Sequence, residues 1–180
     1  GGKFEVLSAM LEKLANVYAQ VPAVQYQLAV AYLAGNETDK AVASLTRALS
    51  SDTNYPDALL LLADIQIKTG RVDPAIVSLK QLSQQNPQIV QARLLLANAY
   101  RIQGDFATAL DIYQQLEADY PTNFEIPLLM GTTYVQQKNN VAARQAFTRA
   151  LNLSPDNFTV LEYLVNLDLR EKQFTSAAQG

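Results

Sequence analysis

The chain has 180 residues, of which 49% are hydrophobic and 17% are charged, and this composition is sufficient to form a real core. The 14 Lys and Arg and 17 Asp and Glu residues give a net charge of -3. The basic residues are spread singly, so we expect no nucleic-acid binding and no polybasic lipid patch. There are no Cys and no His residues, which excludes disulfides, zinc fingers, thiol nucleophiles and Ser-His dyads.

The sequence begins with a short segment that precedes the complete repeats. Gly1-Gly2 is interpreted as a tag remnant, and one helix is expected at about 4–19, in a segment 3–21 that corresponds to the second helix of a preceding half repeat. The longest apolar run, 58–63, is too short to span a membrane, so no direct membrane insertion is expected. From residue 22 onward the sequence repeats every 34 residues, with complete units at 22–55, 56–89, 90–123 and 124–157 and a truncated unit at 158–180.

The period rests on columns of equivalent residues. One column is alanine throughout: Ala41, Ala75, Ala109, Ala143 and Ala177. A second column is small until its last member: Ala29, Ala63, Ala97, Gly131 and Val165. Within each unit the apolar spacing predicts two antiparallel helices. The inner turn is expected near Gly35, Gly70, Gly104, Lys138 and Lys172, and the outer turn at Thr53, Pro87, Pro121 and Pro155.

The alanine column has a physical reason. Where two helices cross closely, only a very small side chain lets the backbones approach. A large residue in this column should overpack the crossing and destabilise the fold by roughly 1 to 3 kcal/mol. Ala109→Leu is therefore predicted to lower the melting temperature, whereas Thr108→Leu is not.

These columns resemble the tetratricopeptide repeat family. The motif of the family has an apolar-small pair, an aromatic residue, a turn glycine, a near-constant alanine, a second aromatic and a closing proline. The unit 90–123 matches the motif best. In 56–89, Gln66 replaces the aromatic residue, and in 124–157, Lys138 replaces the turn glycine. No unit has the tryptophan that is frequent in the family; in the first complete unit its position is held by Gln25. The resemblance implies an all-α fold, a right-handed superhelical α-solenoid of stacked antiparallel helix pairs whose first helices line a concave groove.

Function is expected in that groove, as a protein-protein interaction scaffold that binds a partner peptide or helix. No catalytic, cofactor-binding or metal-binding residue is predicted. The groove columns indicate the candidate partner-binding residues Tyr26, Val30, Leu60, Asp64, Ile67, Leu94, Asn98, Arg101, Leu128, Thr132 and Asn166. For the leucines among them, membership of the packed core is the alternative interpretation.

Two known uses of the family do not fit these residues. The clamp for acidic chaperone C-termini needs lysine where Tyr26, Leu60 and Leu94 stand. The asparagine ladder of O-linked glycosyltransferases needs asparagine at positions held by Gln27, Leu61, Leu95 and Leu129. Neither function is therefore predicted.

Three alternatives remain at this stage. The leucine-rich first helices resemble bacterial repeat proteins of exopolysaccharide assembly and secretion, which implies a periplasmic or outer-membrane-associated scaffold. The second alternative is a recruiting arm of an enzyme whose catalytic domain lies elsewhere. Asp57, Asp64 and Glu125 are interpreted as solvated residues at the rim of the groove, and not as catalytic carboxylates. The third alternative is an end-to-end homodimer, because the truncated last unit, which ends after Ala177-Ala178, leaves apolar residues uncovered. The compartment, cytoplasmic or periplasmic, is not indicated.

Overall fold

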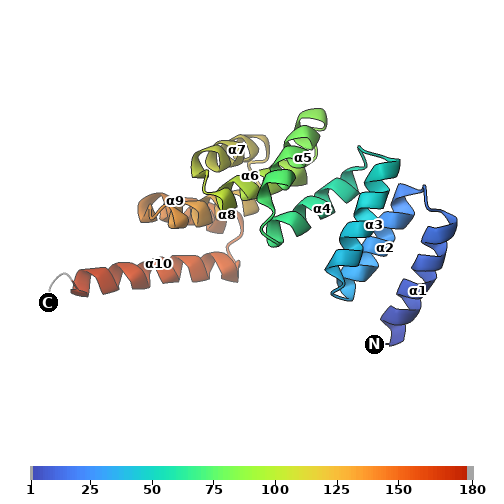
Figure 1. Ribbon diagram of the computed structural model, residues 1–180. Helices are drawn as coiled ribbons and strands as arrows, with labels where there is room; N and C mark the ends of the chain where they lie inside the picture. Colours follow the sequence, from blue (N-terminus) through green and yellow to red (C-terminus); the bar gives the residue numbers. More distant parts are fainter. Residues whose placement is uncertain (1, 178–180) are drawn as a thin grey trace. The chain divides into compact units, whose positions relative to one another are not determined.

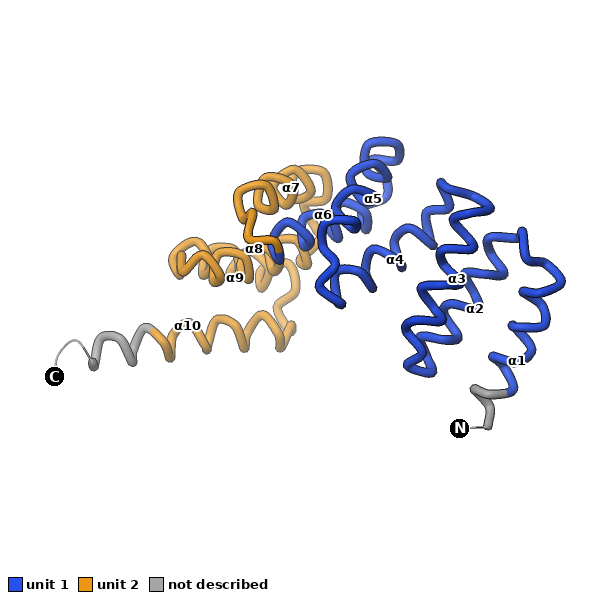
Figure 2. Tube along the Cα trace, viewed as in Figure 1, with its two compact units in different colours: residues 1–102 blue, residues 103–180 orange. Residues whose placement is uncertain are grey.

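The chain folds into α-helices joined by short turns (Figure 1). The computed structural model describes the backbone of residues 2–177 and the side chains of residues 6–170, and no strand occurs within these residues. Gly1 and Ala178 lie outside the described residues, and the side chain of Ala177 is outside them too. The prediction of an all-α solenoid of stacked helix pairs is confirmed. The chain divides into two compact units, Gly1–Ile102 and Gln103–Gly180 (Figure 2).

Unit 1 stacks its helices in chain order. Each first helix packs on its own second helix, so α2 contacts α3 and α4 contacts α5, while α1 packs on α2 and α3 on α4. The first helices begin at Pro22, Pro56 and Val90, 34 residues apart. Proline suits the first helical position because its missing N–H has no partner there. The helices are α1 Gly2–Val17, α2 Pro22–Ala34, α3 Thr38–Ser51, α4 Pro56–Lys68, α5 Val72–Gln85 and α6 Val90–Gln103.

Unit 2 repeats the arrangement. Helix α7 packs on α8, α8 on α9, and α9 on α10. The helices are α7 Phe106–Asp119, α8 Glu125–Gln136, α9 Asn140–Leu153 and α10 Phe158–Ala177.

The alanine columns lie at the helix crossings. Ala41, Ala75, Ala109 and Ala143 are fully buried, and so are Ala29, Ala63 and Ala97. A residue of this size lets two backbones approach until the larger side chains on either side interlock. The register read from the sequence therefore places its small residues inside the core.

Glycine at position 131 of α8 makes room for an aromatic ring. A Cβ atom built on Gly131 would lie 2.5 Å from Cδ1 and 2.8 Å from Cζ of Phe147. The ring of Phe147 is fully buried and stacks on Tyr163 of α10, with 4.9 Å between ring centroids and 8° between planes. The equivalent pairs of unit 1 are Ala29 with Leu45 and Ala63 with Leu79, in which alanine replaces glycine and a smaller side chain replaces the ring. Glycine and phenylalanine therefore form a matched pair in unit 2.

The inner turns share one backbone conformation. The left-handed residues are Asn36, Gly70, Gly104 and Lys138, with φ between 60° and 91° and a spacing of 34 residues. In the first of these turns Asn36 takes this role, because Gly35 lies one residue before the position set by the register and has a φ of -90°. Asparagine tolerates left-handed φ better than most residues. Lys138 has no such advantage, so the turn before α9 is strained.

The residue after the third inner turn caps the helix that follows it. The side chain of Asp105 accepts a hydrogen bond from the backbone N–H of Thr108 at 3.1 Å and another from its hydroxyl at 2.6 Å. Both bonds lower the pKa of Asp105. Thr108→Leu would remove one of these cap contacts, so the exposed Ala107 is a better control position for Ala109→Leu.

Helix α10 does not contain the turn that the register places at position 172. It runs unbroken from Phe158 to Ala177, so the expected second helix of the last unit does not form within these residues. At the equivalent turn before α9, the side chain of Asn139 accepts a hydrogen bond from the N–H of Ala142. Positions 170–173 are Arg-Glu-Lys-Gln, which are good helix formers without a capping residue. The alanine column alone does not specify a turn.

Two polar contacts fix α1 on α2. Gln25, at the position of the family's tryptophan, is almost fully buried, and its Nε2 donates to the carbonyl oxygen of Ala15 at 3.3 Å. The last carbonyls of a helix lack partners within the helix, so this amide satisfies one of them. The hydroxyl of Tyr32 donates to Oε1 of Glu12 at 2.6 Å. Burial, followed by this hydrogen bond, raises the pKa of Tyr32 to about 12.

Candidate functional site

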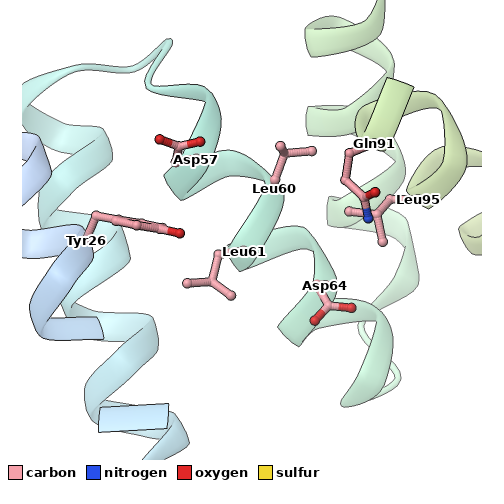
Figure 3. A pocket seen from close by; sticks show the side chains of 7 residues that line it. All are labelled: Tyr26, Asp57, Leu60, Leu61, Asp64, Gln91 and Leu95. Carbon is pink, nitrogen blue, oxygen red and sulfur yellow. The ribbon is translucent and has the colours of Figure 1, made fainter. Parts of the chain in front are cut away.

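A surface pocket of about 230 Å³ lies across the first helices of three successive repeats in unit 1. Tyr26 comes from α2, four residues come from α4, and two come from α6 (Figure 3). The lining residues are Tyr26, Asp57, Leu60, Leu61, Asp64, Gln91 and Leu95. Figure 3 shows the seven side chains on α2, α4 and α6 that line it.

Helix α4 supplies most of the pocket because it has two apolar faces. Asp57, Leu60, Leu61 and Asp64 are spaced i, i+3, i+4 and i+7, which places them on one side of a helix. Ala58, Ala63, Ile65 and Ile67 are the buried residues of α4. The leucine run of this helix thus serves both the core and the pocket.

An aromatic pair borders the pocket on the α2 side. The rings of Tyr26 and Tyr55 meet edge to face, with centroids 6.0 Å apart. Burial is the main reason that the pKa of Tyr55 is raised, and the negative charge of Asp57 adds to it. The half-buried ring of Tyr26 therefore packs against Tyr55 and shares the pocket lining with Asp57.

The other carboxylate, Asp64, is shared between two hollows. Lys68 Nζ lies 2.7 Å from Asp64 Oδ2, and its side chain is 72% exposed. The second hollow, of about 270 Å³, lies toward the ends of α2 and α4 and is lined by Leu33, Thr38, Asp64, Ile65, Lys68 and Thr69. The acidic residues of the main pocket therefore lie at two ends of its apolar centre.

A tetratricopeptide repeat model matches residues 36–99 and 100–165, well over half of the chain. The chain belongs to the tetratricopeptide repeat (TPR) family. No curated protein matches the sequence significantly.

Solved structures of other TPR proteins are similar over most of the chain. YrrB, "a TPR protein with an unusual peptide-binding site", is 18% identical with a TM-score of 0.74, and the match covers 89% of this chain and 83% of YrrB. MamA from Desulfovibrio magneticus RS-1 is 19% identical with a TM-score of 0.77, covering 87% and 89%. TTC0263 from Thermus thermophilus is 26% identical with a TM-score of 0.70, covering 84% and 83%. The proteins of this family are interaction modules, and the fold of the present chain is theirs.

Three of the predicted groove residues of this TPR chain meet in the main pocket. They are Tyr26, Leu60 and Asp64. Val30, on the same helix as Tyr26, is 40% exposed but does not line the pocket. The first helices of unit 1 thus place part of the predicted set around one space.

Other predicted residues of unit 1 have structural roles. Ile67 and Leu94 are buried, with 5% and 8% of their surfaces exposed. Asn98 accepts two hydrogen bonds from the guanidinium group of Arg101, at 2.6 Å and 3.2 Å. The core interpretation that the sequence left open for the leucines therefore describes Leu94.

The predicted residues of unit 2 are dispersed. Leu128 packs partly buried against the core cluster around Phe147, and the hydroxyl of Thr132 donates to the carbonyl oxygen of Leu129 within α8. Asn166 lines a hollow of about 90 Å³ between α8 and α10, together with Val135, Tyr163, Leu167 and Arg170. This hollow is smaller than the pocket in unit 1.

Four of the pocket residues were not predicted from the sequence as binding candidates: Asp57, Leu61, Gln91 and Leu95. Leu95 faces the pocket, whereas its neighbour Leu94 is buried. The signal was present, because Leu61 and Leu95 stand in the column that corresponds to the asparagine ladder of other TPR proteins. A shift of one residue on a helix turns a side chain by about 100°, and the pocket takes residues from both columns, Tyr26 and Leu60 from one and Leu61 and Leu95 from the next.

The pocket offers binding chemistry more readily than catalysis. Among the described residues, no group of three or more His, Cys, Asp or Glu side chains is arranged to hold a metal ion. Within the same residues, no helix combines the length and apolar character required to cross a membrane. The pocket combines an apolar centre with polar side chains at its edge, which is the usual composition of a ligand-binding site.

Proposed function

We propose that this TPR chain is a scaffold that binds an extended or helical segment of a partner protein along α2, α4 and α6. One observation carries the proposal: three successive first helices direct side chains into the same pocket. The apolar side chains of Leu60, Leu61 and Leu95 supply surface that a partner side chain can bury. The peptide-binding site named for YrrB, a protein of the same fold, supports a peptide as the ligand.

The geometry of the pocket also supports a role without catalysis in this segment. Its two carboxylates are seven residues apart on one helix, a separation of about 10 Å along the helix axis. Directly paired acid and base groups would have to lie closer than this. An enzyme that uses this chain as a recruiting arm would carry its catalytic residues elsewhere.

The test is a comparison of two leucine-to-glutamate variants. Leu60→Glu places a charge in the pocket, whereas Leu153→Glu changes the last residue of α9, where the side chain is 41% exposed. Leu94→Glu is unsuitable because Leu94 is buried. Proteins captured from a cell extract are quantified for the wild type and both variants, after circular dichroism has shown that all three are folded.

We expect at least one captured protein to be reduced about tenfold or more by Leu60→Glu and retained by Leu153→Glu. A charge left unpaired in an apolar contact costs enough free energy to cause this loss. If every captured protein remains bound to folded Leu60→Glu, the groove is not the binding surface.

A second candidate function is end-to-end self-association, and exposed apolar stripes at both ends of the array favour it. On α1, Val6, Met10 and Leu14 are 62%, 64% and 43% exposed. On α10, Leu161, Val165 and Leu169 are 38%, 55% and 52% exposed. Both sets are spaced i, i+4, i+8, so each forms one continuous stripe. In the repeat pattern, α1 occupies the position of a second helix and α10 that of a first helix. Since a first and a second helix pack together within each repeat, the stripe on α10 of one molecule is suited to pack on the stripe on α1 of another.

The self-association test uses one charged substitution on each stripe. Head-to-tail pairing predicts that Met10→Glu and Val165→Glu are each monomeric alone, while their mixture forms a one-to-one dimer through the two unaltered stripes. Light scattering measures the masses. A monomeric wild type at high concentration, or a mixture that remains monomeric, contradicts the head-to-tail arrangement.

A further inference from the structure

The ionisable side chains at the edge of the pocket in unit 1 indicate the charge of its ligand. Two separate carboxylates, Asp57 and Asp64, belong to the lining, whereas no Lys or Arg does. The two arginines of α6, Arg93 and Arg101, are not among the lining residues. A charged ligand group that enters this pocket therefore meets negative charge.

The first carboxylate is available for a ligand. Asp57 is exposed and forms no ion pair with the residues that the structure describes. It lies on the same side of α4 as Leu60, and Tyr26 borders the same space. A cation at this end would gain the charge of Asp57 and the face of an aromatic ring, and both attract Lys and Arg side chains.

The second carboxylate has a partner that a ligand can replace. Asp64 pairs with Lys68 at the i, i+4 spacing, and the lysine side chain is 72% exposed. Exposed pairs of this kind contribute little because water screens them and the long side chain loses freedom. A ligand guanidinium group can make two parallel hydrogen bonds to a carboxylate, which the lysine cannot.

We propose that the groove of unit 1 takes a cationic segment of a partner protein in which an apolar side chain lies between two Lys or Arg residues. This inference rests on the proposed groove-binding function. The apolar side chain contacts Leu60, Leu61 and Leu95, and the two cations face Asp57 and Asp64. Seven residues of helix span about 10 Å. About three residues of an extended polyproline II chain cover the same distance and return to the same face, so the cations are spaced i, i+3.

The probe is a fluorescein-labelled, C-amidated peptide of sequence Gly-Arg-Leu-Ala-Arg-Gly, and binding to the whole chain is measured by fluorescence anisotropy. Matched peptides carry Glu or Gln in place of both Arg residues. We expect the Arg peptide to bind more tightly than both, and its affinity to fall as salt is raised from low to physiological concentration. Chemical-shift changes in labelled protein identify the helices that the peptide contacts.

The protein variants separate local charge from net charge. Asp57→Asn with Asp64→Asn should weaken the Arg peptide about five- to tenfold. The control pair, Asp39→Asn with Asp111→Asn, alters exposed carboxylates on α3 and α7 by the same net charge and should leave the affinity unchanged. Lys68→Ala should strengthen binding a few-fold because it removes the competing cation of Asp64.

The outcomes distinguish this inference from the groove function itself. Equal or tighter binding of the Glu or Gln peptide on α2, α4 and α6 overturns the cationic ligand but supports the groove. If the Arg peptide shifts only the resonances of α3, α5 and other second helices, the cationic ligand of the groove is overturned, and the groove function again depends on the Leu60→Glu capture experiment. No binding of the Arg peptide at millimolar protein overturns the cationic ligand, while the Leu60→Glu capture experiment still decides the groove function.

Discussion

Substitution of Gly131 by alanine tests the packing of unit 2. We expect it to lower the free energy of unfolding, whereas the same substitution inside an ordinary helix raises it. Alanine is favoured over glycine inside a helix by about 0.8 to 1 kcal/mol. At position 131, however, the added Cβ would lie 2.5 Å and 2.8 Å from two ring atoms of Phe147. The ring is fully buried and is stacked on Tyr163, so it cannot move aside without disturbing α10.

The overlap should cost more than alanine gains. Overpacking a buried site costs roughly 1 to 3 kcal/mol, and an overlap with three ring atoms places this site in the upper half of that range. After the gain of alanine in a helix is subtracted, Gly131→Ala is expected to reduce the free energy of unfolding by about 1 to 2 kcal/mol. The same change in a Phe147→Leu background recreates the alanine-leucine pairs of unit 1. There the ring is gone, and alanine should stabilise the protein by about 0.5 to 1 kcal/mol.

Denaturant unfolding followed by far-ultraviolet circular dichroism of the wild type, both single variants and the double variant gives a complete cycle. The expected interaction energy between positions 131 and 147 is about 1.5 to 3 kcal/mol. A Gly131→Ala variant that is as stable as the wild type or more stable, or one whose effect is the same in both backgrounds, would refute the steric explanation for the glycine.

Three further predictions concern packing, turn strain and pH. Ala109→Leu should lower the free energy of unfolding by roughly 1 to 3 kcal/mol, while Ala107→Leu, at an exposed position of the same helix, should not; equal melting temperatures would contradict the register. Lys138→Gly should stabilise the chain by up to about 1 kcal/mol, because glycine adopts the left-handed φ of 60° without steric cost; a loss of stability in denaturant unfolding would contradict this. Since the pKa of Tyr32 is raised from 10.0 to about 12, its stabilising contribution is complete below pH 10 and is lost as the pH rises toward 12. Tyr32→Phe should therefore lose less stability than the wild type between these pH values, and an identical loss in urea unfolding would contradict the raised pKa of Tyr32.

The helical repeat could be predicted from the sequence because packing imposes the same demand on every unit. A buried crossing needs alanine wherever it recurs, so Ala41, Ala75, Ala109 and Ala143 reveal the period directly. The same periodicity does not specify chain reversal. The turn at Lys138 forms beside the capping residue Asn139, whereas α10 continues through the equivalent position.

The pocket could be predicted only in part because helix phase is less certain than helix position. Tyr26, Leu60 and Asp64 were identified, but Leu94 was chosen where Leu95 faces the pocket. In a helix with apolar residues at three consecutive positions, composition does not distinguish the core side from the groove side. The surrounding helices decide that, and their positions follow from tertiary packing.

The difference between constant and variable columns explains why the ligand was harder to infer than the fold. Constant columns satisfy a packing requirement that every repeat shares, and they carry no information about a particular ligand. The column that borders the pocket changes along the chain, from Ala23 to Asp57, Gln91 and Glu125. Because Asp57 and Gln91 line one pocket, a single ligand meets two chemically different members of the same column. Specificity in this array should therefore lie where the repeats differ, and exchanging Asp57 and Gln91 would alter ligand choice without altering the helix crossings.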